Sequence, residues 1–173
     1  MPSKRRGRFL SVPGMIETTP TPDLAAIKAR QQATWASGDF HTVAARIALT
    51  AEHLVDSANL HAGWGVLDVA TGSGNAAIAA ARLGCRAVDY VPALLERGRE
   101  RARAEGLDLD LRDGDAEDLS FTDASFDAVL SVFGTMCAPD HQRTAAEVLR
   151  VCRAGGTIAL ASWTSDGFIG EMS

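Results

Sequence analysis

Short apolar segments alternate with longer amphipathic segments along most of the chain, and their order predicts the fold class. The apolar runs that predict strands are residues 66–69, 86–90, 107–111, 126–133 and 157–162. The intervening helices are predicted to run to about residue 83, from 92 to 105 and from 139 to about 152. Strands and helices in this order are typical of right-handed crossovers. We therefore predict an α/β fold with a doubly wound parallel sheet.

Two helices are predicted to precede the first strand. The first opens at Thr21, a suitable N-cap, with Pro22 at the first helical position, and it ends near residue 38. The second runs from Phe40 to about Leu60, and one stripe of it carries apolar residues at 43, 47, 54 and 55. The first 20 residues predict a disordered tail. Residues 21–62 and 63–173 are then the helices and the α/β core of one domain.

Length and charge exclude several classes of function. A chain of 173 residues buries enough surface to fold without disulfides or a metal. Its 17 basic and 22 acidic residues give a net charge of −5, and four of the basic residues lie within the first eight positions. The rest of the chain is therefore strongly acidic, which argues against a nucleic-acid partner. No run approaches the roughly 18 apolar residues of a membrane span, and no apolar segment of an export signal follows the basic stretch, so we expect a cytoplasmic protein.

The three cysteines point to no special chemistry. Cys85, Cys137 and Cys152 are odd in number and widely spaced, with no CxxC pair and no histidine at ligand spacing. We expect buried reduced thiols and no metal site.

A glycine turn follows the first predicted strand and opens an alanine-rich helix. Gly72, Ser73 and Gly74 form this turn. Glycines allow the backbone to turn sharply and a ligand to approach the main chain, and the free amides of a helix start favour an anion or an electron-rich edge. The segment predicts a cofactor cleft. Gly72 and Gly74 with Ala77 also fit the dinucleotide fingerprint, and a plain strand-to-helix turn is a further interpretation.

Carboxylates at three strand ends help to decide among these alternatives. Asp68 lies inside the first strand, Asp89 ends the second, and Asp115 follows the third. In a doubly wound sheet these strand ends lie side by side, so the three acids are expected to converge on one pocket. Three carboxylates suit a cationic ligand and would repel a pyrophosphate, and a carboxylate can accept hydrogen bonds from both hydroxyls of a ribose.

Several linked motifs together resemble the class I S-adenosylmethionine-dependent methyltransferases, in the small-molecule group related to the ubiquinone and menaquinone C-methyltransferases. Residues 66–74 are similar to the family's first motif, and residues 87–90 with Pro92 and Leu95 to its second-strand motif. Residues 114–119, followed by Phe126 and Asp127, resemble the adenine-side motif. Residues 149–156 resemble the turn from the helix into the fifth strand, and the resemblance covers residues 21–173.

The resemblance implies S-adenosyl-L-methionine as cofactor and assigns its contacts. It places the glycine turn near the methionine and ribose, Asp89 on the ribose hydroxyls, and Asp68 at the methionine end. Asp115 would accept from the adenine amino group beside the Ala116 amide, and Phe133 would border the methyl donor. Trp35 and Phe40 would belong to a lid or to helix packing. The expected cofactor-binding residues are Asp68, Ala70, Thr71, Gly72, Ser73, Gly74, Asp89, Tyr90, Asp115, Ala116 and Phe133.

The sequence departs from the family pattern in two places. Ala70 stands where the family commonly has glycine, which fits if the backbone there is extended. The family sheet has seven strands in the order 3-2-1-4-5-7-6, whereas this chain supplies five, in the expected order 3-2-1-4-5. The fifth strand would then be an exposed apolar edge, which predicts a homodimer or a partner chain.

The implied reaction is in-line transfer of a methyl group to a small-molecule acceptor. Alignment of the reactants contributes much of such a rate. His41 and His141 are candidate bases, because histidine is the side chain suited to proton transfer near neutral pH, but the sequence singles out no catalytic residue. The alternatives are a truncated, inactive methyltransferase-like binding subunit that needs a partner, and an NAD-dependent oxidoreductase.

Overall fold

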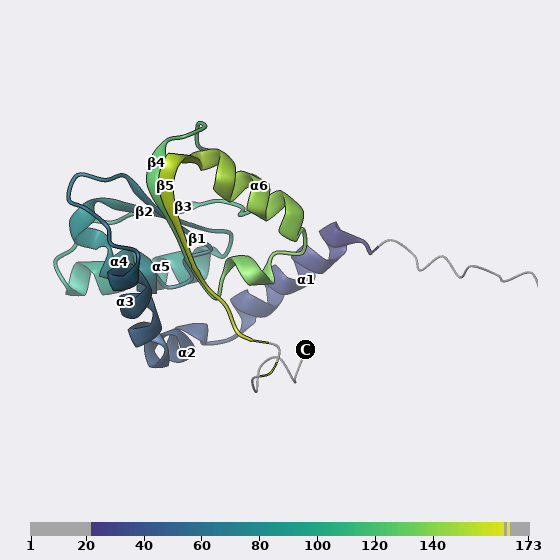
Figure 1. Cartoon of the computed structure of the whole chain (residues 1–173). Coiled ribbons are helices and arrows are strands. Elements are labelled where there is room, and N and C mark those ends of the chain that lie inside the picture. Colours follow the sequence, from purple (N-terminus) through teal and green to yellow (C-terminus); the bar gives the residue numbers. More distant parts are fainter. Residues whose placement is uncertain (1–21, 165, 167–173) are drawn as a thin grey trace, which may run out of the picture.

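The computed structural model describes residues 22–164 and 166, and it forms one parallel sheet with helices on both faces (Figure 1). The strand order is β3-β2-β1-β4-β5, and every pairing is parallel. This confirms the predicted α/β fold and its strand order. The predicted disordered tail lies outside the described residues. The strands are β1 (Val66–Val69), β2 (Cys85–Asp89), β3 (Asp110–Asp113), β4 (Phe126–Val132) and β5 (Cys152–Ala161).

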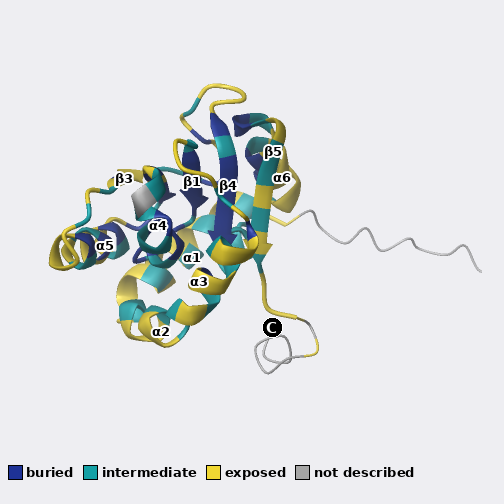
Figure 2. Cartoon of the chain, turned by 60° about the vertical axis from the view of Figure 1, so that its left-hand side comes forward, coloured by how far each residue is buried: buried dark blue, intermediate teal, exposed yellow. Residues whose placement is uncertain are grey.

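The sheet divides the core into two apolar layers. Helices α3 (Ala48–Ser57), α4 (Asn75–Ala79) and α5 (Pro92–Ala104) contribute to the cluster on one face, and α6 (His141–Val151) to the cluster on the other. All four residues of β1 are buried, as expected for a central strand covered on both faces (Figure 2). On α6, Thr144, Val148 and Val151 are buried at helical spacing. The carboxyl ends of the strands are left open to a cleft.

Three helices, and not the predicted two, precede β1. They are α1 (Leu24–Ser37), α2 (Phe40–Arg46) and α3, and the expected helix over residues 40–60 breaks at Ile47, where φ is −108° and ψ is 10°. The break has a packing reason, because α3 packs on α4, β4 and β5 while α2 contacts α5. One straight helix could not do both. The cap of α1 is Asp23, which accepts a hydrogen bond from the Ala26 amide at 3.0 Å, so the prediction of Thr21 as N-cap was wrong.

Other boundaries differ from the sequence prediction for local reasons. Strand β3 begins at Asp110 and not at 107, because Gly106 (φ 67°) and Leu107 close α5 by hydrogen bonds to Arg103 and Ala102. The helix after β1 is shorter than predicted, with α4 followed by the 3-10 turn η1 (Ala81–Leu83). Strand β5 is longer, because a register shift against β4 between Phe126 and Ala128 lets it begin at Cys152.

β5 is the outer strand of the sheet and pairs with β4. Ile158, Leu160 and the following Trp163 are exposed large apolar side chains. Within the described residues, no helix combines the length and apolarity needed to cross a membrane. Cys85 and Cys152 are buried free thiols, as expected, whereas Cys137 is half-buried.

The ends of β1 and β4 approach each other so closely that Gly134 has no room for a side chain. A Cβ on Gly134 would lie 2.3 Å from the Ala70 carbonyl oxygen. Its φ of −87° is accessible to any residue, so the constraint is steric. Gly134 begins the 3-10 turn η2 (Thr135–Cys137), which carries one wall of the cleft.

We expect Gly134→Ala to lower the free energy of unfolding by about 1–3 kcal/mol, because overpacking displaces backbone. Chemical denaturation measures the change. Gly65→Ala is the control, since a Cβ there would meet the Ser125 carbonyl oxygen at 3.6 Å, an ordinary contact. Equal stability of the two variants would contradict the close packing of β1 and β4.

Candidate cofactor-binding site

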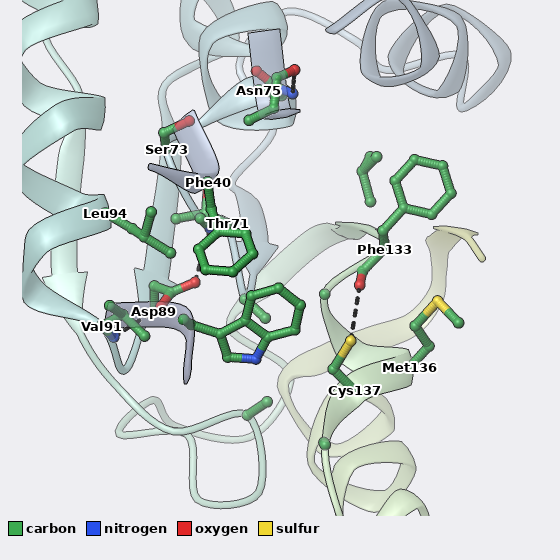
Figure 3. Close-up of a pocket in the computed structure, with 18 of the residues that line it drawn as sticks. Phe40, Thr71, Ser73, Asn75, Asp89, Val91, Leu94, Phe133, Met136 and Cys137 are labelled. Atoms are coloured by element: carbon green, nitrogen blue, oxygen red, sulfur yellow. Dashed lines mark hydrogen bonds between the residues drawn. The ribbon is translucent and has the colours of Figure 1, made fainter. Parts of the chain in front are cut away.

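A cavity of about 700 Å³ opens at the carboxyl ends of β1, β2 and β4 (Figure 3). Such a volume is typical of small-molecule sites. Helices α1 and α2 and the turn η2 contribute the outer walls. Ten of the eleven residues predicted to bind a cofactor line this cavity, and Gly74 does not. The ten are Asp68, Ala70, Thr71, Gly72, Ser73, Asp89, Tyr90, Asp115, Ala116 and Phe133.

The turn between β1 and α4 is shaped by left-handed backbone. Gly72 has φ 57° and Gly74 has φ 85°, conformations that favour glycine. The Gly74 amide donates to the Thr71 carbonyl at 2.9 Å, and the Thr71 amide donates to the Val88 carbonyl at 3.0 Å. Gly74 is the N-cap of α4, where a Cβ would lie 3.8 Å from Cα of Gly98. It therefore shapes the turn from outside the cavity.

Ala70 has a left-handed backbone with φ 54°, so the expectation of an extended backbone there was wrong. For a residue with a Cβ this conformation costs about 1–2 kcal/mol. Phe133, at the end of the neighbouring strand β4, is also left-handed, with φ 59°. Two strained residues thus stand side by side on the cavity wall, a placement that is common at functional sites.

Asp68 is the most deeply buried acidic residue of the described chain, with 1% of its surface exposed. Its Oδ2 atom accepts from the Thr71 hydroxyl at 2.6 Å and from the Ala77 amide at 3.0 Å. Its Oδ1 atom is buried and has no hydrogen-bond partner among the described residues. Burial raises the pKa of Asp68 to about 7, against the opposing effect of the two hydrogen bonds. A cation or a donor from a ligand would offset the cost of ionising this carboxyl group.

Asp89 joins the glycine turn to the end of β2. Its Oδ2 atom accepts from the Gly72 amide and its Oδ1 atom from the Val91 amide, both at 2.8 Å. A carboxylate has about four acceptor sites, so both oxygens can accept further bonds from a ligand. Burial raises the pKa of Asp89, and the nearby charge of Asp113 acts in the same direction.

Asp115 is engaged from α1, which sequence reasoning did not anticipate. Lys28 Nζ lies 2.6 Å from Asp115 Oδ2 and 2.5 Å from Glu117 Oε2. The Asp115 Oδ1 atom accepts from the Glu117 amide at 2.9 Å. A second tie from α1 joins Gln32 Nε2 to the Tyr90 carbonyl at 2.5 Å. Because α1 has no buried residue, these polar contacts do much to hold it over the cavity.

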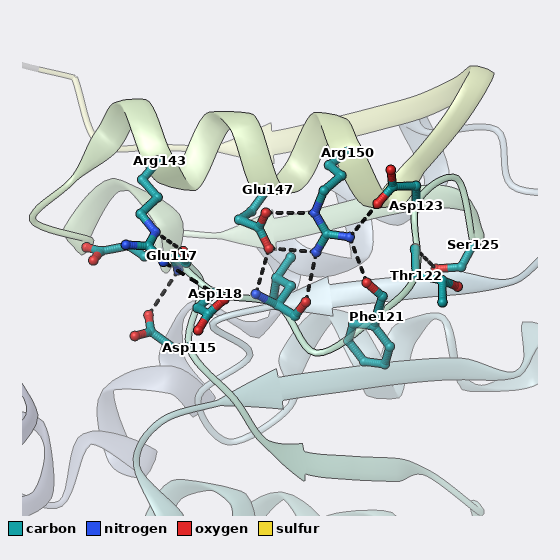
Figure 4. Close-up of polar contacts among 11 residues, drawn as sticks. Asp115, Glu117, Asp118, Phe121, Thr122, Asp123, Ser125, Arg143, Glu147 and Arg150 are labelled. Atoms are coloured by element: carbon teal, nitrogen blue, oxygen red, sulfur yellow. Dashed lines mark hydrogen bonds and ion pairs between the residues drawn. The ribbon is translucent and has the colours of Figure 1, made fainter.

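The loop that carries Asp115 and Ala116 is anchored on α6 by two arginines (Figure 4). Arg150 donates to the carbonyls of Leu119 and Phe121 at 2.8 and 2.7 Å and pairs with Glu147 at 2.7 Å. Arg143 Nε donates to the Glu117 carbonyl at 2.6 Å. The hydrogen bond from Arg150 also lowers the pKa of Glu147, whose Oε2 atom accepts from the Leu119 amide.

A third arginine supports the glycine turn from α5. Arg101 Nη1 donates to the Ser73 carbonyl and to Asn75 Oδ1, each at 2.8 Å. Burial lowers the pKa of Arg101. The sequence places this arginine in an ordinary charged helix, so only the packing of α5 against the turn shows that it supports the site.

The candidate bases lie beside the cavity, and the predicted lid aromatics line it. His41 Nδ1 is 3.3 Å from Ser73 Oγ, and the exposed His141 Nε2 is 3.1 Å from the Met136 carbonyl. Trp35 and Phe40 line the cavity and form an edge-to-face pair with ring centroids 4.8 Å apart. Within residues 22–164 and 166, no group of three or more histidine, cysteine, aspartate or glutamate side chains could hold a metal ion.

Comparison with known families decides the class of protein. The Methyltransferase domain family matches residues 67–160, which is more than half of the chain. This chain belongs to the methyltransferase domain family. The match supports the resemblance to the class I S-adenosylmethionine-dependent methyltransferases. The matched residues contain the glycine turn and the three carboxylates.

Relatives of this methyltransferase domain cover most of the chain. Two uncharacterized proteins of Mycobacterium tuberculosis are 43% and 45% identical over 161 residues, which is 91% of this chain and 59% of each relative. The chain therefore spans less than two thirds of the length of these relatives. A demethylmenaquinone methyltransferase of Deinococcus radiodurans is 40% identical over 99 residues, covering 55% of this chain and 41% of that enzyme.

Solved structures share the fold of this methyltransferase domain. The YcgJ protein of Bacillus subtilis has a TM-score of 0.61 and 28% identity, covering 64% of this chain and 49% of that one. A protein solved in complex with the Haloferax volcanii Trm112 methyltransferase activator has a TM-score of 0.66 and 30% identity, covering 76% and 59%. None of these matches supports the oxidoreductase alternative.

The raised pKa of Asp68 makes stability depend on pH. The folded-state pKa of about 7 lies above the unfolded value of about 3.9. The folded state therefore binds more protons between pH 4 and 7, and the stabilisation is lost as the pH rises through 7. We expect the free energy of unfolding of the ligand-free chain to fall between pH 5 and 8, by an amount on the order of 1–4 kcal/mol.

Chemical denaturation across this pH range measures the effect. Asp68→Asn keeps an acceptor oxygen and should lose most of the pH-dependent fall. Asp56→Asn changes an exposed carboxylate on α3 and should keep it. A wild-type fall that persists unchanged in Asp68→Asn would show that other groups cause it.

Proposed function

We propose that this chain binds S-adenosylmethionine in the cavity and transfers its methyl group to a small-molecule acceptor. The observation that carries the proposal is the set of three carboxylates on the cavity wall, of which Asp68 has an Oδ1 atom with no hydrogen-bond partner among the described residues. A ligand with a sulfonium and an ammonium group suits these acids, whereas a pyrophosphate would be repelled. The residues present therefore fit the cofactor that the family implies.

Each carboxylate has a distinct proposed role. Asp89 accepts hydrogen bonds from the two ribose hydroxyls while it keeps the Gly72 and Val91 amides. Asp68 stabilises the ammonium group of the methionine part through its charge. Asp115 accepts from the adenine amino group and shares its carboxylate with Lys28. Tyr90 and Ala116 supply cavity wall between these groups.

The glycine turn admits the cofactor to the main chain. Ala70, Thr71, Gly72 and Ser73 line the cavity and approach the ribose and methionine parts, and Gly74 holds the turn in shape. Phe133 borders the methyl donor. When bound, S-adenosylmethionine supplies an electrophilic methyl group on a positively charged sulfur. The chain contributes binding, alignment and exclusion of water, which supply a large part of the rate enhancement in such a transfer.

Calorimetric titration with S-adenosylhomocysteine tests the cofactor site. We expect binding by the wild-type chain, and a loss of at least about tenfold in affinity for Asp89→Ala, since hydrogen bonds to a charged group are each worth about 1.5–3 kcal/mol. Asp89→Asn, which keeps one acceptor for the turn, should show a smaller loss. Asp56→Ala is the control, because this exposed acid on α3 does not line the cavity.

Titration at pH 7 in buffers of different ionisation enthalpy adds a second readout. The ammonium group of S-adenosylhomocysteine, placed near Asp68, lowers the pKa of Asp68 from about 7, so binding should release a fraction of a proton, and Asp68→Asn should release less. A folded wild-type chain that binds NADH and not S-adenosylhomocysteine would contradict the proposed function.

The fold alone does not decide the reaction, since the [4+2]-cyclase SpnF shares it with a TM-score of 0.63 at 22% identity, over 70% of this chain and 48% of that one.

We further infer that a partner strand covers the edge of β5, supplied by a second copy of this chain or by another polypeptide. An outer strand with exposed apolar side chains readily pairs with another strand. The neighbour bound to the Trm112 activator shows that one related fold works with a partner chain. An inactive binding subunit that depends on such a partner is the second candidate function.

Light scattering tests whether the edge of β5 pairs with a second copy of the chain. We expect a dimer for the wild-type chain and a monomer for Leu160→Lys, because Leu160 on β5 is 50% exposed and a charge there opposes pairing. Leu149→Lys, on α6 and also exposed, should leave the dimer intact. A monomeric wild-type chain would contradict the homodimer.

A further inference from the structure

Among the described residues that line the cavity, Lys28 alone carries a positive charge. It comes from α1, and its Nζ atom lies 2.6 Å from Asp115 Oδ2 and 2.5 Å from Glu117 Oε2. The Lys28 side chain is 26% exposed, so its ammonium group belongs to the wall of the cavity. A donor and the carboxylate proposed to bind the adenine amino group therefore stand next to each other on this wall.

Polar contacts on both sides fix the position of the Lys28 side chain. Gln32 lies four residues further along α1, on the same face of the helix, and its Nε2 atom donates to the Tyr90 carbonyl at 2.5 Å. Glu117 lies on the loop that α6 holds (Figure 4), and its Oε1 atom accepts from the amide of Asp140, the N-cap of α6, at 2.9 Å. The ammonium group is thus placed between a tied helix and a held carboxylate.

The Lys28 ammonium group keeps donor capacity for a ligand. It has three N–H donors, and the described contacts use two of them, on Asp115 and Glu117. Burial lowers the pKa of Lys28, but hydrogen bonds to Asp115 and Glu117 and the charges of these two acids raise it more, and the net shift is upward. The group is therefore a permanent donor at neutral pH.

An acceptor and a donor side by side form a pattern that one edge of adenine complements. On this edge adenine presents its amino group as a donor and ring atom N7 as an acceptor, whereas guanine presents two acceptors, O6 and N7. Asp115 Oδ2 and Lys28 Nζ, 2.6 Å apart, offer the matching acceptor and donor.

We propose that Lys28 binds the adenine ring of the cofactor, by donating a hydrogen bond to N7 while Asp115 accepts from the amino group. The inference rests on the proposed function, which draws on Asp115 and Ala116 at the adenine end and gives Lys28 no contact with the ligand. With Lys28 added, the wall selects adenine by two adjacent groups. A base without N7 would leave the third donor of the ammonium group without a partner. A Lys28 that only held α1 on the loop would affect all ligands of the cavity equally.

Calorimetric titration with three ligands tests the contact. They are S-adenosylhomocysteine and its 7-deaza and 1-deaza analogues, each of which replaces one ring nitrogen by C–H. We expect the wild-type chain to bind the 7-deaza analogue at least about tenfold more weakly than S-adenosylhomocysteine, because a hydrogen bond from a charged donor is lost.

Variants of Lys28 assign the lost hydrogen bond to its donor. Lys28→Met keeps the length of the side chain and removes the charge and the donors. It should bind S-adenosylhomocysteine at least about tenfold more weakly than the wild-type chain, and it should bind the 7-deaza analogue with the same affinity as S-adenosylhomocysteine. Lys28→Arg keeps a charged donor and should keep the preference for S-adenosylhomocysteine.

Two controls separate binding from support of the fold. The effect of the 1-deaza change should be the same in Lys28→Met as in the wild-type chain, because Lys28 is not assigned to N1. Arg30→Met removes a positive charge from an exposed position of the same helix, outside the cavity, and should keep all wild-type affinities. Circular dichroism checks that each variant folds, and Lys28→Leu repeats the comparison with a second apolar side chain.

The outcomes distinguish the two proposals. A folded wild-type chain that binds no S-adenosylhomocysteine overturns the proposed function and this inference with it. A wild-type chain that binds S-adenosylhomocysteine and the 7-deaza analogue equally overturns the inference alone. A preference that survives unchanged in Lys28→Met also overturns it, since Lys28 would then only hold α1 on the loop.

Discussion

The site depends on two buried carboxylates that hold the glycine turn by its own backbone. Asp68 accepts from the Thr71 hydroxyl and the Ala77 amide, and Asp89 accepts from the Gly72 and Val91 amides. Both acids are almost fully buried, and burial raises the pKa of each. Hydrogen bonds from the turn thus offset the desolvation cost of the two carboxyl groups, and both groups retain acceptor capacity for a ligand.

The surroundings of this turn are built to keep it in place. Arg101 supports it from α5, and Arg143 and Arg150 fix the neighbouring loop of Asp115 and Ala116 to α6. On the other side, Ala70 and Phe133 keep strained backbones where β1 and β4 end. Gly134 has no side chain, which allows its backbone to lie against Ala70. The cavity therefore has a polar side with fixed acceptors and an apolar side that contains the stacked rings of Phe133 and Trp163.

Much of this arrangement could be predicted from the sequence because its signals are local. The short run 66–69, apolar except for Asp68, the glycines after it and the acids at successive strand ends are enough to indicate a parallel sheet with a cofactor cleft. What the sequence did not reveal depends on packing between distant segments. Lys28 reaches Asp115 across 87 positions, and Arg150 reaches the carbonyls of residues 119 and 121 from the next helix.

The errors have the same origin. The break at Ile47 follows from the need of α2 and α3 to contact different elements. The left-handed Ala70 lies against Gly134 at the end of β4, a contact between distant segments that no local pattern around residue 70 reports.

The central claim is that the carboxylates and the glycine turn form one cofactor site. Backbone amide NMR spectra of the chain with and without S-adenosylhomocysteine test it most directly. The account predicts shifts grouped at residues 68–75, 89–91 and 115–116, with little change on the outer strand β5. Shifts that avoid these three segments, in a folded chain that binds the ligand, would contradict it.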